Sequence, residues 1–230
     1  MRKHTRTLII GAGALIALGA LPACGSETSP APNASESPTA AATPFPESAK
    51  YIADVQKDGI TMTIGIAVDG DSVTAYACDG SREEAWFFGD EQDGSLSLTG
   101  GFDDTLSGSY NGKTVDGDLT VDDVTYTFTA AAVPAPAGMY TATAGDTRAS
   151  WIVRPDGSIT GVQNGSARSD RESIGELNKR QDADAKQRLA DLRKNRKLSS
   201  APPLRFGTWT STINGTPVTA KIVDGNTRFN

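Results

Sequence analysis

Histidine is almost absent from this chain of 230 residues, because its one histidine is His4, close to the start. A Ser-His-Asp or Cys-His nucleophile needs an imidazole beside the attacking group. Many zinc sites also use imidazole nitrogens as ligands. The residues after His4 therefore cannot form either kind of histidine site, which excludes a large share of hydrolase and metalloenzyme chemistry.

Long apolar runs are also scarce, and the longest lies at the start of the chain. Arg2, Lys3 and Arg6 precede an uncharged stretch, residues 7–23, that is rich in leucine and isoleucine. A basic start followed by a short apolar core is typical of a secretory signal. A permanent transmembrane anchor needs about 20 strongly apolar residues, and the glycines here weaken the run. We therefore expect residues 1–23 to be a signal peptide.

The stretch Leu21-Pro22-Ala23-Cys24 closes this run and resembles the lipobox of bacterial lipoprotein precursors. The resemblance lies in the aliphatic Leu21, the small Ala23 and the cysteine. It implies cleavage before Cys24, a diacylglycerol group on its sulfur, and commonly a further chain such as palmitate on its nitrogen. Two or more chains hold a protein stably on a membrane. We expect Cys24 to anchor the protein at the extracytoplasmic face of the cell membrane, with ordinary secretion as the alternative.

Cysteine is the second scarce residue, since the chain has only Cys24 and Cys78. Lipid on Cys24 leaves Cys78 without a partner for a disulfide within the chain. A lone thiol in an exported protein is typically a buried, small apolar residue. We expect Cys78 to lie in the core, and an exposed reactive thiol is the alternative.

Residues 24–49 contain few large apolar side chains and many Pro, Ser, Thr and Ala residues. Such a segment cannot bury enough apolar surface to offset the entropy lost on ordering. We expect a disordered tether between the lipid and the folded part.

Positive charge is in deficit overall, with 28 acidic and 22 basic side chains and a formal net charge of −6. The acidic excess lies in residues 50–166, whereas residues 167–230 are basic. Binding to phosphate backbones needs a basic surface. We therefore expect no nucleic-acid partner.

Residues 50–166 show a period of two, as in Ile60-Thr61-Met62-Thr63-Ile64, which is typical of half-buried strands. Asp-Gly and Asn-Gly pairs separate the runs and predict tight type I′ turns. We expect one mainly β domain, an antiparallel up-and-down meander that forms a barrel or a sandwich. Gly117 follows too closely on the turn at Asn111-Gly112 and is expected to be a bulge. The expected strands are 60–68, 73–78, 85–88, 95–98, 105–110, 114–121, 124–130, 139–142, 150–153 and 158–162, with Trp86 and Phe88 in the core.

This part of the chain also resembles secreted, uncharacterised β-rich proteins of high-GC Gram-positive bacteria. The resemblance rests on the runs 75–80, Trp86-Phe87, 137–140 and 151–157. It implies a bacterial source and no particular activity.

Residues 167–203 form a charged segment in which one long basic helix is expected over 169–198. Serines at 169 and 173 fit capping boxes. The helix would pack through a narrow stripe of Ala185, Leu189 and Leu192. Residues 204–230 should form a C-terminal β-hairpin around Asn214-Gly215 that returns to the main sheet of the same domain.

Two acidic stretches are candidates for chemistry. The run 90–94 lacks the spacing of an EF-hand, so we interpret it as a turn and expect no metal site. Glu83-Glu84, just before Trp86, is the best candidate for a carboxylate pair of the kind that hydrolyses glycans.

The leading hypothesis is a non-enzymatic, membrane-tethered β domain that binds a ligand or scaffolds at the cell envelope, without a cofactor. Its partner would be an envelope protein or a small apolar ligand. The alternatives are a carrier with a lipid or other apolar ligand in a barrel cavity, and a carboxylate-based glycan hydrolase.

Overall fold

The computed structural model describes residues 43–180 and 182–229. Within those residues, no helix combines the length and the apolar character needed to cross a membrane. The predicted signal peptide, the lipobox-like stretch with Cys24 and most of the predicted tether lie outside the described residues.

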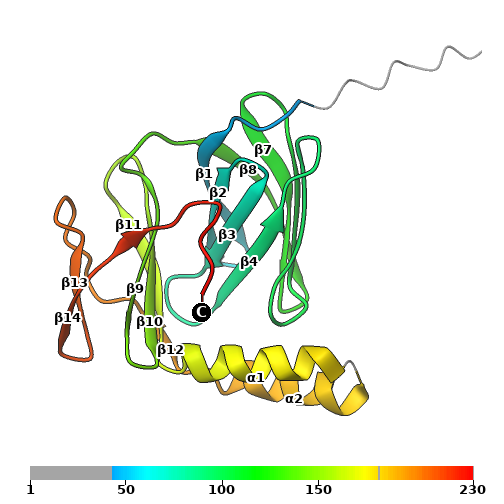
Figure 1. The fold of residues 1–230 in the computed structure, drawn as a ribbon, viewed down its shortest axis with the longest axis vertical. Helices are drawn as coiled ribbons and strands as arrows, with labels where there is room; N and C mark the ends of the chain where they lie inside the picture. The colour runs from blue at the N-terminus through cyan, green and yellow to red at the C-terminus, as the bar shows by residue number, and fades with distance from the viewer. Residues whose placement is uncertain (1–42, 181, 230) are drawn as a thin grey trace, which may run out of the picture. The chain divides into compact units, whose positions relative to one another are not determined.

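Eight strands form one antiparallel sheet that curls into a nearly closed barrel (Figure 1). Strands adjacent in the sequence pair with each other except for β4 and β5, and β1 also pairs with β8 through Tyr51–Ala132 and Ile52–Ala131. Strands β4 and β5 diverge after their turn and meet again at an isolated bridge between Phe87 and Gly100. The strands are β1 (Ser48–Lys57), β2 (Ile60–Asp69), β3 (Ser72–Cys78), β4 (Glu84–Asp90), β5 (Ser95–Thr99), β6 (Thr105–Tyr110), β7 (Thr114–Val121) and β8 (Val124–Ala132).

The barrel interior is packed with apolar side chains from every strand. Alternate residues of a strand point to opposite faces, so the period-two runs of the sequence supply the interior. It includes Met62, Ile64 and Ile66 from β2 and Leu106 and Leu119 from β6 and β7. The predicted mainly β meander is confirmed, and it forms a filled barrel.

The outer face of β5–β8 bears small polar side chains. One row across these strands consists of Ser97, Ser107, Asp118 and Thr127, which are paired in register and exposed. This half of the barrel faces water, which leaves the outer face of β1–β4 as the apolar half.

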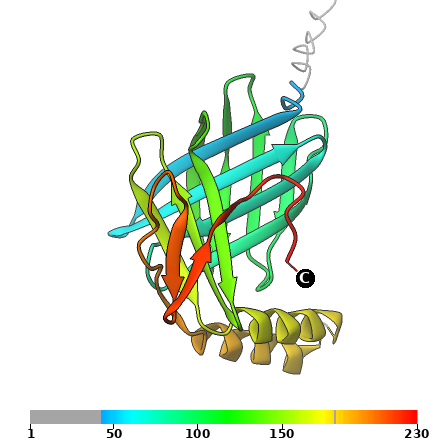
Figure 2. The same ribbon diagram turned by 60° about the vertical axis from the view of Figure 1, so that its left-hand side comes forward.

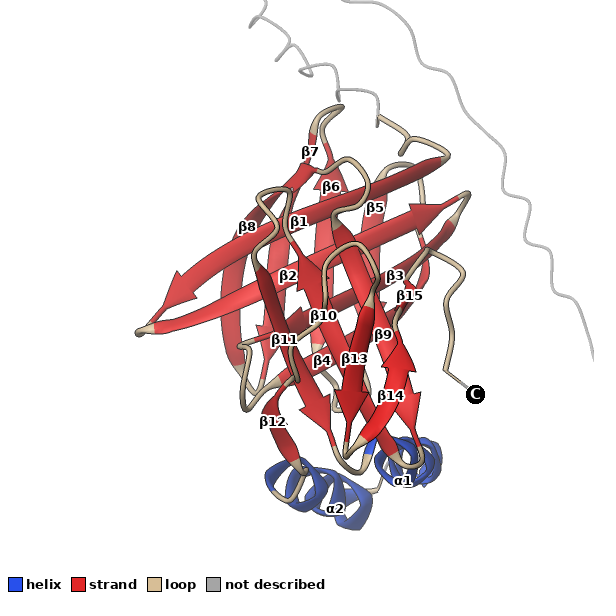
Figure 3. Ribbon diagram, turned by 90° about the vertical axis from the view of Figure 1, so that its left-hand side faces the viewer, coloured by secondary structure: helices blue, strands red, loops and turns tan. Residues whose placement is uncertain are grey.

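A second antiparallel sheet covers that apolar half (Figure 3). Tyr76 and Cys78 on the outside of β3 pack in one buried cluster with Met139 and Ile152 of the second sheet. Gly65 of β2 permits the close approach, because a Cβ there would lie 2.5 Å from Met139 Cγ. The second sheet has the order β12 (Leu198–Ser200), β11 (Ile159–Asn164), β10 (Thr147–Val153), β9 (Gly138–Ala144), β15 (Lys221–Ile222).

The expected hairpin forms around Asn214-Gly215, whose φ angles of 49° and 81° fit a type I′ turn. Its strands are β13 (Thr210–Ile213) and β14 (Thr216–Thr219). The sequence suggested that this hairpin returns to the main sheet, but it does not join the barrel sheet. It instead covers the far face of the second sheet, where Ile213 packs with Trp151, and the chain then adds β15 to the edge of that sheet.

Two helices lie side by side across one end of the barrel and the second sheet (Figure 2), so the prediction of one long helix is wrong. They are α1 (Ala167–Arg180) and α2 (Ala183–Lys194). The break follows from Asp182, whose side chain accepts a hydrogen bond from the amide of Ala185 at 2.7 Å and caps α2. The start of α1 is capped from another element, because Asp146 accepts hydrogen bonds from the amides of Arg168 and Ser169.

Two further expectations for the barrel need correction. Gly117 is not a bulge, since it pairs in unbroken register with Gly108 and Phe128. The strands approach so closely there that a Cβ on Gly117 would lie 2.0 Å from the carbonyl oxygen of Ser107. In β4, Phe87 faces the interior and is fully buried, whereas Phe88 faces outward beside Trp86.

The folded part also begins earlier than predicted. Strand β1 starts at Ser48, within the expected tether, and pairs with β2 along its whole length. Phe45 packs edge-on against Tyr51 and stacks on Tyr110 at the end of the barrel away from the helices.

Candidate functional site

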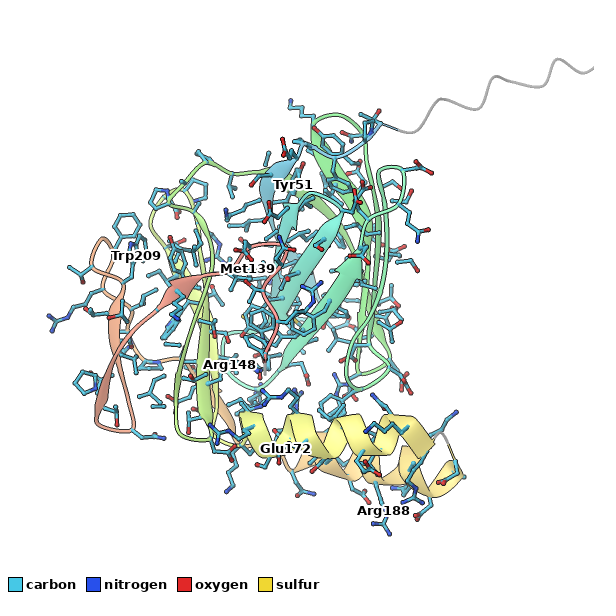
Figure 4. The ribbon with its side chains drawn as sticks, in the orientation of Figure 1. Tyr51, Met139, Arg148, Glu172, Arg188 and Trp209 are labelled. Carbon is cyan, nitrogen blue, oxygen red and sulfur yellow. The ribbon has the colours of Figure 1, made fainter. Side chains whose placement is uncertain are left out.

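A cleft of about 420 Å³ lies where the outer face of β4 meets the ends of β10 and β11, helix α1 and the last described residues. Figure 4 shows Arg148 at this junction, directly beside the helices. The cleft borders the isolated bridge between β4 and β5, because Trp86 and Gly100 line it. Its apolar walls are formed by Trp86, Phe88, Phe102, Ile174 and Phe229.

Four polar residues from distant parts of the sequence meet at the base of the cleft. Glu84 begins β4 and lies two residues before Trp86, so both side chains point to the outer face of the barrel. Arg148 and Asn164 are paired in register on β10 and β11 and therefore lie side by side. Asp170 joins them from the first turn of α1. We call Glu84, Arg148, Asn164 and Asp170 the buried polar cluster, since each is at most 7% exposed.

Hydrogen bonds connect the whole cluster. Arg148 Nη2 donates to Glu84 Oε1 at 3.0 Å. Asn164 Nδ2 lies 3.2 Å from Glu84 Oε1 and 3.1 Å from Asp170 Oδ2. Ser166 completes the set by donating to Asp170 Oδ2 at 2.9 Å. The amide of Asn164 thus bridges two carboxylates, and one guanidinium offsets their charge.

Three buried polar atoms around the cluster have no hydrogen-bond partner among the described residues: Glu84 Oε2, Arg148 Nε and Trp86 Nε1. A buried polar group that lacks a partner costs about 1–3 kcal/mol, and more if it is charged. Native proteins rarely keep such groups without a reason. They offer one acceptor and two donors beside a cleft that has apolar walls.

Comparisons with protein-family models, with curated proteins and with solved structures find no match. The chemistry of the cleft is therefore the observation from which a function can be inferred. Aromatic walls with a few converging polar groups are typical of small-molecule sites.

The predicted pair Glu83-Glu84 is divided between two environments. Glu84 belongs to the buried polar cluster, whereas Glu83 forms ion pairs with Arg193 and Arg196 at the end of the helical segment. Burial raises the pKa of Glu83, and the two guanidinium groups offset part of that effect. Glu83 therefore ties the helices to the barrel and does not face Glu84 as a catalytic partner.

The remaining sequence candidates have structural roles. Cys78 is fully buried between the sheets, as expected, and burial raises its pKa to about 12, so the thiolate is disfavoured at neutral pH. The run 90–94 forms a turn in which Glu91 accepts a hydrogen bond from the amide of Gly94. Across residues 43–180 and 182–229, no three acidic, cysteine or histidine side chains are grouped so that they could hold a metal ion.

Sequence reasoning found Glu84 and Trp86 but missed Arg148, Asn164, Asp170 and Phe229. Arg148 carried a usable signal, because it is the one charged residue in the otherwise uncharged strand β10, every residue of which is buried. A charge in such a strand must be paired. Asn164 and Asp170 carried no comparable signal, since they lie in polar stretches and meet Glu84 only in the folded chain.

Proposed function

We propose that the protein is a membrane-anchored extracytoplasmic lipoprotein whose β domain binds a small organic molecule in the cleft. The cleft itself supports this proposal most directly. Its volume of about 420 Å³ lies in the range of roughly 300–1,000 Å³ that is common for small-molecule sites. Its aromatic walls would supply affinity, and the buried polar cluster would orient the ligand.

The packed barrel interior favours a site beside the barrel over one inside it. A carrier that encloses an apolar ligand needs a hollow interior, but Met62, Leu106 and Leu119 fill this one together with their neighbours. The small ligand that we propose therefore contacts the outside of β4.

The geometry supports binding more than catalysis. The pair that suggested a glycan hydrolase, Glu83-Glu84, is divided in the fold, and the carboxylate that lies near Glu84 is that of Asp170. Such an enzyme needs one carboxyl group that holds a proton and a second that is free to act as base or nucleophile. Here the amide of Asn164 bridges one oxygen of each group and Arg148 pairs with Glu84, so the two carboxylates are tied to each other and to a cation. We propose a non-enzymatic role.

Native mass spectrometry of the purified protein tests the binding site. We expect a co-purified small molecule in the unaltered chain and its loss in Ile174→Trp, because a larger side chain at that wall fills the cleft. Leu177→Trp, three residues further along the same helix and outside this cleft, should retain the molecule. A ligand that remains bound to both variants would place the binding site elsewhere.

Membrane fractionation tests the anchor at Cys24. The Cys24→Ala chain should move from the membrane fraction to the soluble fraction, because no sulfur remains to accept the diacylglycerol group. Unaltered protein should stay with the membrane until detergent is added. A Cys24→Ala chain that has lost residues 1–23 and still sediments with membranes would contradict the lipid anchor.

A further inference from the structure

We infer that the ligand of the cleft carries a planar aromatic ring with a hydrogen-bond donor, and that this ring binds where Phe229 now lies. The inference rests on the proposed binding function. It assigns a ligand class to that site and a role to the last described segment, residues 223–229, which we call the tail.

Phe229 occupies the aromatic part of the site as a ligand would. Its ring centre lies 4.4 Å from the guanidinium carbon of Arg148. Its ring also stands edge-on to Trp86 at 4.7 Å and to Phe88 at 5.6 Å. A cation beneath a ring and two aromatic rings at its side form a surface that selects flat aromatic groups.

The start of the tail is fixed, because Val223 and Gly225 are buried, whereas its end is held through side chains. The amide of Val223 donates to the carbonyl of Met139 in the second sheet, whereas the hydrogen bonds of residues 225–228 to the barrel each involve a side chain. Thr74 Oγ1 lies 3.0 Å from the carbonyl oxygens of Gly225 and Thr227. Arg228 donates to the carbonyl of Gly89 on β4 at 3.3 Å. Displacing residues 226–229 would therefore leave Val223 in the core and the paired strands of both sheets intact.

Phe229 leaves the polar requirements of the site unmet. Arg148 and Trp86, on which its ring lies, each retain a buried nitrogen without a partner, and Glu84 retains an oxygen. A phenyl ring has no polar atom to offer them. A ring that bears a donor can bond to Glu84 Oε2, and a hydrogen bond to a charged group is stronger than a neutral one. Such a ligand has an advantage over Phe229 at the same place.

Competition by Phe229 has a measurable consequence. If the tail covers the site for most of the time, the apparent affinity for an outside ligand falls by the fraction of molecules in which the site is open. Removing the ring of Phe229 should then tighten binding of a matching ligand, although it also removes an aromatic contact.

Calorimetric titration of the full chain with indole, a planar ring with one N–H donor, tests the inference. We expect Phe229→Ala to bind indole about tenfold more tightly than the unaltered chain. Phe206→Ala removes the same side chain from an exposed position that is outside the cleft, and it should leave the affinity unchanged. 1-Methylindole, in which the donor is blocked, should bind Phe229→Ala about tenfold more weakly than indole does.

Several results would separate this inference from the proposed function. Weaker indole binding by Phe229→Ala would show that the ligand binds beside Phe229 and does not take its place. Equal binding of indole and 1-methylindole would show that the ligand needs no hydrogen-bond donor. A co-purified ligand that Ile174→Trp loses, in a protein that never binds indole, would leave the function standing and overturn the ligand class. If Phe229→Ala fails to fold, Phe229→Leu, which keeps an apolar side chain without the ring, serves for the same titration.

Discussion

Replacing Arg148 with alanine is expected to lower the free energy of unfolding by about 3–5 kcal/mol. Arg148 is the cation that pairs with Glu84, and the two side chains are only 9% and 3% exposed. Its removal leaves a carboxylate buried with the amide of Asn164 as its remaining partner. Urea unfolding followed by tryptophan fluorescence measures the loss.

A variant at an exposed ion pair shows how much of the stability loss comes from burial and how much from losing any ion pair. Arg188 pairs with Asp184 on the exposed side of α2, where both side chains are more than 60% exposed. Arg188→Ala should cost at most about 1 kcal/mol. The double change Glu84→Gln with Arg148→Ala should be less harmful than Arg148→Ala alone, because the carboxylate that pairs directly with Arg148 is then neutral too. Equal losses in Arg148→Ala and Arg188→Ala would contradict a buried cluster.

Phe87→Ala is expected to cost about 3–5 kcal/mol, because it deletes a fully buried ring from the barrel interior and leaves a cavity. Phe87 also bridges to Gly100 at the point where β4 and β5 meet. The barrel is least completely paired there, so side-chain packing contributes much of the closure. Thermal and urea unfolding both report this change.

Phe88→Ala is the neighbouring control. Phe88 is only partly buried on the outer face, so its loss should cost about 1–2 kcal/mol. The two variants should also differ in the cleft, because Phe88 lines it and Phe87 does not. A larger destabilisation by Phe88→Ala than by Phe87→Ala would show that Phe88, and not Phe87, faces the barrel interior.

Local chemistry predicted most of the barrel. The alternation in β2 and the turn at Asp58-Gly59 determine both the strand and its connection, since each depends on neighbours in sequence. Strand β1 was missed because its central residues, Tyr51, Ile52 and Ala53, are buried on both faces and show no alternation. Strand β2 is also buried on both faces, but it keeps its alternation because Gly65 and Ala67, which face the second sheet, are small.

The errors at β4 and in the helical segment have similar causes. In Trp86-Phe87-Phe88 three aromatic residues follow one another, so hydrophobicity could not show which of them faces inward. Asp182 lies in a charged run where many residues could cap a helix, and its role became visible only with the bond from Ala185. The site was hardest to predict because its parts come from β4, β10, β11, α1 and the tail. Contacts of that kind depend on how the two sheets pack.

The pairing of β1 with β8 has a consequence for how the chain folds. Tyr51 and Ile52 reach their second neighbours only at Ala132 and Ala131, so one edge of β1 stays open until eight strands have been added. Contacts so distant in sequence slow folding, and an unpaired edge can recruit strands from other chains. During synthesis from the first residue onward, one edge of β1 would therefore stay unpaired until residue 132 has been made. The tail can settle on β4 only after that, so the cleft would be the last part of the molecule to form.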